Sequence, residues 1–112
     1  MARGRSFRCE LAESRETDVN GNPLMTVKCH GELITDTADK LKDVVSPLIP
    51  LGGRIIIDLG GVKHLDSSGL GALISLKAAT IKQGTCLLQL ANMTPGVMEI
   101  LRVTQLTQMF SS

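Results

Sequence analysis

The chain has 112 residues, with 12 basic and 11 acidic side chains that give a formal net charge of +1. Its hydrophobic fraction of 43% is near the usual globular level, which excludes wholesale disorder and predicts one folded domain. The near-neutral charge and the absence of Trp and Tyr argue against a nucleic-acid partner, which needs a basic face or aromatic stacking platforms.

The sequence also lacks the features of membrane, metal and disulfide proteins. It has no run of about 20 apolar residues and no apolar signal-peptide core, so we expect a soluble, cytoplasmic protein with no membrane partner. The cysteines, Cys9, Cys29 and Cys86, are odd in number and form no Cys-x-x-Cys pair. They predict reduced packing residues rather than disulfide bonds or a zinc site. We expect no metal and no cofactor.

The first part of the chain predicts a β-hairpin behind a flexible arm. Residues 1–6 form the expected arm, and residues 7–16 form the first expected strand. The Asn20-Gly21 step supplies the positive φ angles of a tight turn. Apolar and polar side chains then alternate over residues 24–30, which is typical of a half-buried strand paired with the first.

A helix and a buried strand are expected next. Gly31-Glu32-Leu33 closes the second strand, Asp36 is placed to cap a helix, and Pro47 and Pro50 mark the end of that helix. Three consecutive isoleucines in the segment 54–59 favour a strand buried on both faces, as in a parallel sheet. The apolar stripe of the helix consists of Ala38, Leu41, Val44, Val45 and Leu48.

Two more helices and one more strand follow. The first helix begins in the segment 66–71, and residues 86–90 form a short strand. Thr94 and Pro95 are typical of a helix start, as N-cap and first helical residue. A last short strand is expected at residues 109–112. The predicted inner faces consist of Leu70, Leu73, Ile74, Ala78 and Ile81 for the first helix, and Val97, Ile100, Leu101 and Thr104 for the second.

The predicted order is therefore β-β-α-β-α-β-α, with one further strand at the end. Strands that alternate with helices after an initial hairpin indicate a mixed, mostly parallel sheet covered by helices, with the hairpin at one side. The predicted fold class is α/β, with a single domain over residues 7–112.

The segment most informative about function is Asp66-Ser67-Ser68-Gly69-Leu70-Gly71, between a buried strand and a helix. Open α/β sheets place their binding surfaces at this end of their strands. One serine could simply cap the helix, which stabilises by about 1 kcal/mol. Two serines are more than a cap needs, and each glycine costs roughly 1 kcal/mol against alanine in a helix. We therefore expect the glycines to let another molecule approach the backbone, at a helix N-terminus that tolerates a phosphate.

His64, Asp66 and Ser67 supply the residue types of a catalytic triad, but triads are assembled from separate elements. The sequence has no Gly-x-Ser-x-Gly elbow, no dinucleotide fingerprint and no Walker-type loop. His30 and His64 lack the spacing of a metal site and are expected at the surface or at a sheet edge. We therefore expect no catalytic residues. The alternative of a serine hydrolase predicts labelling by a fluorophosphonate probe, and we expect none.

Two stretches of the sequence resemble the STAS domain family, and more narrowly the bacterial anti-sigma factor antagonists. The first is Asp66-Ser67-Ser68-Gly69-Leu70-Gly71, preceded by Ile55-Ile56-Ile57-Asp58-Leu59. The second is Gly31-Glu32-Leu33, followed by Thr37-Ala38-Asp39-Lys40-Leu41. The resemblance covers nearly the whole chain, from Phe7 to Phe110. It implies a STAS-like domain with helices packed on one side of a mixed sheet.

The resemblance also implies a function and a set of partners. Family members bind an anti-sigma factor that is also a serine kinase, and so free a sigma factor for transcription. The resemblance implies that this kinase phosphorylates Ser67, with Ser68 as second choice and as helix cap, and that a serine phosphatase restores binding. We expect a monomer or a weak dimer. The residues implied in partner binding are Glu32, Leu33, Asp36, Thr37, Asp66, Ser67, Gly69 and Leu70.

Two alternatives stay open at this point. The residues between Glu32 and Thr37 could be turn and helix-cap residues only. The chain could also be a STAS scaffold or regulatory subunit of a stress-signalling or transporter complex, in which the serine is unmodified or serves assembly.

Overall fold

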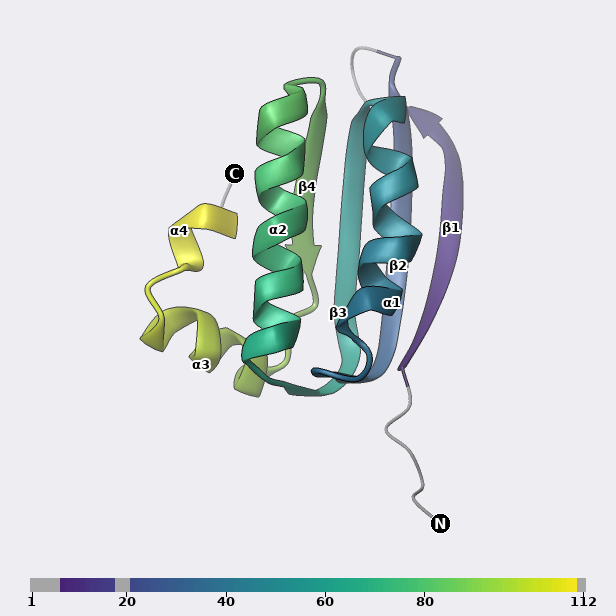
Figure 1. Ribbon diagram of the computed structural model, residues 1–112. Helices are drawn as coiled ribbons and strands as arrows, with labels where there is room; N and C mark the ends of the chain where they lie inside the picture. The colour runs from purple at the N-terminus through teal and green to yellow at the C-terminus, as the bar shows by residue number, and fades with distance from the viewer. Residues whose placement is uncertain (1–6, 18–20, 111–112) are drawn as a thin grey trace.

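Four strands form one mixed sheet in the order β1-β2-β3-β4 (Figure 1). The structure is a computed structural model that describes residues 7–17 and 21–110. The expected arm at residues 1–6 lies outside this part of the chain. Strand β1 runs antiparallel to β2, whereas the β2–β3 and β3–β4 pairs are parallel. The strands are β1 (Phe7–Thr17), β2 (Pro23–Leu33), β3 (Gly53–Leu65) and β4 (Cys86–Ala91).

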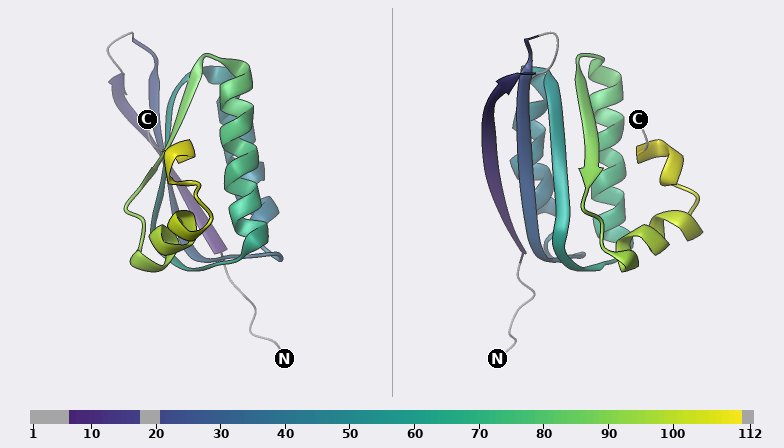
Figure 2. Two further views of the ribbon diagram at one scale, coloured as in Figure 1. Left: turned by 90° about the vertical axis from the view of Figure 1, so that its left-hand side faces the viewer. Right: turned by 180° about the vertical axis from the view of Figure 1, so that it is seen from behind.

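Helices connect the parallel strands, as the α/β prediction requires. Helices α1 and α2 cover the same face of the sheet, and the opposite face has no helix over it in the described part of the chain (Figures 1 and 2). The prediction of a mixed sheet with helices on one side is confirmed. The helices are α1 (Ala38–Val45), the 3-10 helix η1 (Ser46–Leu51), α2 (Ser67–Gln83), α3 (Pro95–Val103) and α4 (Thr107–Phe110). None of these helices is long and apolar enough to span a membrane.

The hydrophobic core lies between the sheet and its two covering helices. Strand β3 contributes Ile55 and Ile57, which are completely buried, whereas Ile56 between them points to the uncovered face and is only half-buried. The prediction of burial on both faces is therefore wrong, because helices cover only one face. The completely buried aliphatic side chains include Val27, Leu33, Leu41, Val45, Ile55, Ile57, Leu59, Leu73 and Leu88.

Strand β3 is longer than the isoleucine run indicated. It continues through Gly60 and Gly61 to Leu65, with a register shift against β2 at this point. A Cβ on Gly61 would lie 2.5 Å from the Nδ1 atom of His30, so only glycine fits opposite that side chain. The glycine pair therefore marks an irregularity inside the strand and not its end.

The inner face of α2 differs from the predicted stripe in its second half. Ala78 and Ile81 are exposed, and Lys77 and Thr80 are buried in their place. The Lys77 ammonium group donates to the carbonyl of Leu88 at 2.9 Å, and the Thr80 hydroxyl donates to the carbonyl of Lys77 at 2.7 Å. Burial is tolerated because the polar atoms have partners. The buried residues of α2 are Gly69, Leu70, Ala72, Leu73, Leu76, Lys77 and Thr80.

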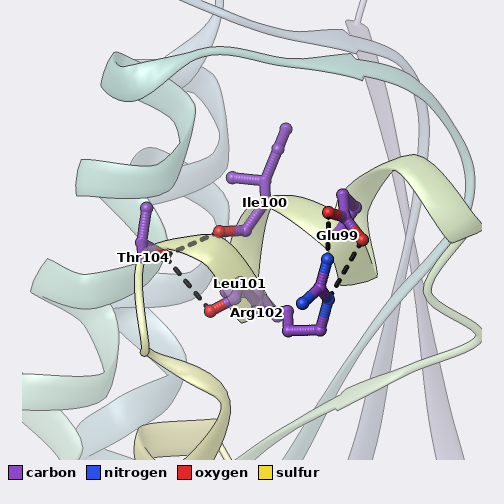
Figure 3. A network of polar contacts seen from close by, with 5 residues as sticks. All are labelled: Glu99, Ile100, Leu101, Arg102 and Thr104. Carbon is purple, nitrogen blue, oxygen red and sulfur yellow. Dashed lines mark hydrogen bonds and ion pairs between the residues drawn. The ribbon is translucent and has the colours of Figure 1, made fainter.

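Helix α3 begins as the sequence predicts and ends differently. The Thr94 hydroxyl accepts a hydrogen bond from the Val97 amide, and Pro95 is the first helical residue. Thr104 is exposed and is not an inner-face residue. It follows the last helical residue, and its hydroxyl donates to the carbonyls of Ile100 and Leu101 in the last turn of the helix (Figure 3).

The last residues that the structure describes are helical and not extended. Residues 107–110 form the short helix α4, so the predicted last strand is wrong over its described part. Phe110 is buried in the core there. On the preceding helix, Glu99 and Arg102 form an ion pair one turn apart (Figure 3).

Replacing Ile57 and Ile56 separately by alanine tests the one-sided core. Ile57→Ala should cost about 2–5 kcal/mol of unfolding free energy, because it leaves a cavity under the helices. Ile56→Ala should cost less than half as much, since its side chain faces solvent in part. Urea unfolding of both variants measures the difference, and equal losses would contradict the assignment of faces.

Candidate functional site

Three connections meet at one end of the sheet, where β2, β3 and β4 end (bottom of Figure 1). Leu33 at the end of β2 is paired with Leu65 at the end of β3. The loop at residues 34–37 therefore starts beside Asp66, which leads into α2. This is the end of a parallel sheet at which ligands and partners usually bind.

Asp66 organises this end of the sheet. Its Oδ1 atom accepts a hydrogen bond from the Gly69 amide at 2.9 Å, which makes Asp66, and neither serine, the N-cap of α2. Its Oδ2 atom accepts from the amide and the hydroxyl of Thr35, at 3.0 and 3.2 Å. The prediction that Ser68 caps the helix is wrong. The Asp66 carboxylate takes the capping role, and it can accept the Thr35 hydrogen bonds as well because a carboxylate accepts several donors at once.

These hydrogen bonds favour the ionised form of the carboxyl group. The pKa of Asp66 is lowered, first by the Gly69 amide and then by the amide and hydroxyl of Thr35, while partial desolvation opposes the shift. Asp66 is therefore a fixed negative charge at neutral pH that links α2 to the loop after β2.

The two serines of the motif have different surroundings. The Ser68 hydroxyl lies 3.1 Å from the hydroxyl of Thr35 and belongs to the Asp66 network. Ser67 is the first residue of α2 and is exposed, and within residues 7–17 and 21–110 no group hydrogen-bonds to its hydroxyl. Ser67 is therefore the serine whose hydroxyl another molecule can reach.

Thr35 is the site residue that sequence reasoning missed. Its side chain is exposed, yet its amide and hydroxyl connect two loops that are 31 residues apart in the sequence. A signal was available, because the loops that follow adjacent parallel strands emerge side by side. Applying that rule to β2 and β3 would have placed Thr35 next to Asp66.

The motif glycines have two separate roles. A Cβ on Gly69 would lie 2.1 Å from the carbonyl oxygen of Leu33, so Gly69 is needed for close contact between α2 and β2 of the chain itself. The interpretation that Gly69 admits another molecule is therefore wrong. Gly71 is exposed, and a Cβ there would meet no atom within 4 Å. Gly71 leaves the helix surface open on the side toward solvent.

The structure divides the predicted partner residues into two groups. Ser67 and Asp36 are exposed, and Glu32 and Asp66 are partly exposed. The other four are buried and support the surface from below. These four are Leu33, Thr37, Gly69 and Leu70.

Thr37 shows how the loop after β2 is held in place. Its buried hydroxyl donates to the Glu32 carbonyl at 2.5 Å and accepts from the Ile34 amide at 2.9 Å. Thr37 also takes the N-cap position of α1 that the sequence assigned to Asp36. Its hydroxyl does not cap the helix, because it closes the loop instead.

His64, Asp66 and Ser67 are not arranged as a catalytic triad. The Asp66 carboxylate is directed at Thr35 and Gly69, while the His64 Nε2 atom lies 4.0 Å from Glu32. Within the part of the chain that the structure describes, no three His, Cys, Asp or Glu side chains are grouped to hold a metal ion.

An apolar hollow lies along α3, outside the residues of the Asp66 network. It has a volume of about 410 Å³, and α3 follows β4 at the same end of the sheet (Figure 1). The exposed side chain of Met98 forms part of its wall. A second hollow of about 480 Å³ lies at the other end of the sheet, between Gly52 and Thr85.

The sequence was compared with family models and with known proteins. The model of the STAS domain matches residues 14–112. The chain belongs to the STAS domain family. No curated protein sequence matches it significantly.

Anti-sigma factor antagonists and a sulfate transporter family protein are among the solved structures with this fold. An anti-sigma factor antagonist from Mycobacterium paratuberculosis is 21% identical, with a TM-score of 0.74 over 94% of this chain and 83% of that one. The anti-sigma factor antagonist SpoIIAA in its unphosphorylated form is also 21% identical, with a TM-score of 0.68 over 92% and 84%. A sulfate transporter family protein from Wolinella succinogenes is 19% identical, with a TM-score of 0.69 over 79% and 71%. These similarities show a shared fold.

Alanine at the two motif glycines should have opposite effects on this STAS domain. Gly69→Ala should destabilise by about 1–3 kcal/mol or more, because the new methyl group collides with the Leu33 carbonyl. Gly71→Ala should stabilise by up to about 1 kcal/mol, since it adds helix propensity without a clash. Thermal unfolding of both variants provides the measurement, and a loss of stability in Gly71→Ala equal to that in Gly69→Ala would refute the distinction.

The pH dependence of unfolding should report on Asp66. A lowered pKa means that the carboxylate stabilises the fold fully above its unfolded pKa of about 3.9, and that this stability is lost as the pH falls through the folded pKa. Asp66→Asn cannot titrate, so it should be less stable than wild type at neutral pH and approach it below about pH 4. Urea unfolding across this range tests the expectation, which a constant gap would contradict.

Proposed function

We propose that this STAS domain is an anti-sigma factor antagonist that is switched by phosphorylation of Ser67. In the unmodified form it binds an anti-sigma factor that is also a serine kinase, and so frees the sigma factor. The observation that carries the proposal is the exposed hydroxyl of Ser67 at the first residue of α2, to which no group within residues 7–17 and 21–110 forms a hydrogen bond. Its neighbour Ser68 is engaged with the Thr35 hydroxyl, which supports Ser67 rather than Ser68 as the proposed phosphate acceptor.

The charge of a phosphate explains how the switch would act. Phosphoserine carries about −1.5 to −2 charges at pH 7, and Asp66 beside it is already negative. A partner surface shaped for a small hydroxyl would have to desolvate this group without a matching cation. A loss of about 3 kcal/mol would weaken binding more than a hundredfold.

The domain itself has features that tolerate the modification. A phosphate on Ser67 would lie at the positive end of the α2 dipole, which favours anions. The Asp66–Gly69 cap and the Asp66–Thr35 hydrogen bonds involve no atom of the Ser67 side chain. The change would then be local, and a serine phosphatase could restore binding. In this proposal the chain is a cytoplasmic, non-enzymatic regulator.

Other structures of the family support the proposal and an alternative. SpoIIAA from Bacillus has also been solved in its phosphorylated form, and that structure has the same fold as this chain. The murine anion transporter Slc26a9 contains a region with this fold as well, which accounts for 18% of its length. The second candidate is therefore a scaffold or regulatory subunit of a signalling or transporter complex. Light scattering distinguishes the two, because a large homo-oligomer favours the scaffold.

Phosphate transfer from the kinase partner should occur at Ser67. The purified chain is incubated with ATP and each anti-sigma factor serine kinase of its organism, and the modified residue is mapped by mass spectrometry. Ser67→Ala should abolish labelling, whereas Ser68→Ala should be labelled because its neighbour's hydroxyl stays exposed.

Binding of the same kinases provides the second readout. Ser67→Asp should bind at least about a hundredfold more weakly than wild type by calorimetry, as expected for a loss of roughly 3 kcal/mol. Ser67→Ala is the matched control and should still bind, since it adds no charge. Binding that Ser67→Asp leaves unchanged would exclude the switch.

A further inference from the structure

Two cysteines that are distant in the sequence lie directly opposite each other in the structure. Cys9 of β1 and Cys29 of β2 are partners in the antiparallel register. Directly opposed residues of such a pair have Cα atoms about 4.5–5.5 Å apart, and a disulfide bond requires about 4.4–6.8 Å. Both side chains lie on the covered face, since Cys29 is in the core and Cys9 packs against it.

We propose that Cys9 and Cys29 form a reversible disulfide bond when the protein meets a peroxide. The structure holds both as free thiols. Directly opposed positions of antiparallel strands have the Cα spacing that a disulfide bond requires, so no change of register is needed. This redox site is separate from Ser67 and is independent of the proposed function.

The surroundings assign different roles to the two thiols. Cys9 is partly exposed and its pKa is lowered, first by the hydrogen bond from Cys29 and also by the nearby Lys40 ammonium, against the effect of burial. The pKa of Cys29 is raised, first by donating that hydrogen bond and then by burial and by the negative charges of Cys9 and Asp58. The thiolate is the nucleophilic form, so Cys9 attacks the oxidant and Cys29 resolves the product.

The reaction balances with one peroxide for each disulfide. The Cys9 thiolate attacks one peroxide oxygen, the O–O bond breaks, and the departing hydroxide takes up a proton to form water. Cys9 is then a sulfenic acid. The Cys29 sulfur attacks the Cys9 sulfur, the S–O bond breaks, and the leaving hydroxide takes the Cys29 proton as a second water. Two thiols are oxidised by two electrons, and the peroxide is reduced to two waters.

Cys86 is the internal control for this proposal. It lies on β4, which β3 separates from β2, so it cannot reach either partner. It is buried, and burial raises the pKa of its thiol. A general oxidation of cysteines would include Cys86, whereas the proposed reaction would leave it as a thiol.

The test uses the full chain treated with hydrogen peroxide, followed by denaturation and alkylation. We expect one alkylated cysteine instead of three, an intact mass lower by two hydrogen atoms before alkylation, and a Cys9–Cys29 linked peptide. Dithiothreitol should restore all three thiols. Cys86→Ala should still form the disulfide, and Cys9→Ser should not.

The wild-type mapping keeps the test decisive even where a cysteine variant folds poorly. Three alkylated cysteines after treatment that fully oxidises glutathione in the same tube would overturn the proposal. So would a disulfide to Cys86, a covalent dimer, or over-oxidised Cys9 beside a free Cys29 thiol.

Discussion

The N-terminus of α2 touches the backbone of β2 at the carbonyl group of Leu33, and the rest of the candidate site depends on this contact. It requires a residue without a side chain at Gly69, because any Cβ would overlap the carbonyl oxygen. The Asp66 amide also donates to the same carbonyl, at 3.3 Å. With α2 held this close, the Asp66 carboxylate reaches both Gly69 and Thr35. The position of Ser67 on the surface follows from these bonds.

The arrangement separates supporting residues from surface residues within one short motif. Gly69 and Leu70 are buried, Asp66 and Ser68 are engaged in hydrogen bonds, and Ser67 faces solvent. The charge and the hydrogen bonds of Asp66 therefore stabilise the fold, whether or not a partner is bound. A substitution that disturbs partner binding at this end of the sheet has to be checked for stability before it is interpreted as a loss of contact.

Strong local signals in the sequence predicted the fold and the position of the motif. The isoleucine run, the Thr94-Pro95 helix start and the segment at residues 66–71 each identified the correct type of element. The inner face of α2 could not be derived, because Lys77 and Thr80 are polar side chains whose partners, the Leu88 carbonyl and the turn of the helix itself, appear only in the folded chain. Periodicity of apolar residues does not detect buried polar groups.

The register of the hairpin could not be predicted from the sequence for a similar reason. A two-residue turn at Asn20-Gly21 would not place Cys9 opposite Cys29. The observed strands change register between Ser14 and Thr17, and this irregularity aligns the two cysteines. Such shifts arise from the pairing of whole strands and leave little trace in the local sequence. For the same reason the cysteines looked widely spaced and unrelated.

The place of Ser67 in the first turn of α2 limits the kind of enzyme that can act on it. A catalytic cleft that takes its substrate as an extended peptide cannot receive this hydroxyl while α2 is folded and capped by Asp66. An enzyme that modifies the native domain has to recognise a three-dimensional surface, formed by a helix end and the loop after β2. A synthetic peptide with the same six letters lacks that surface, so linear sequence alone does not encode the recognition.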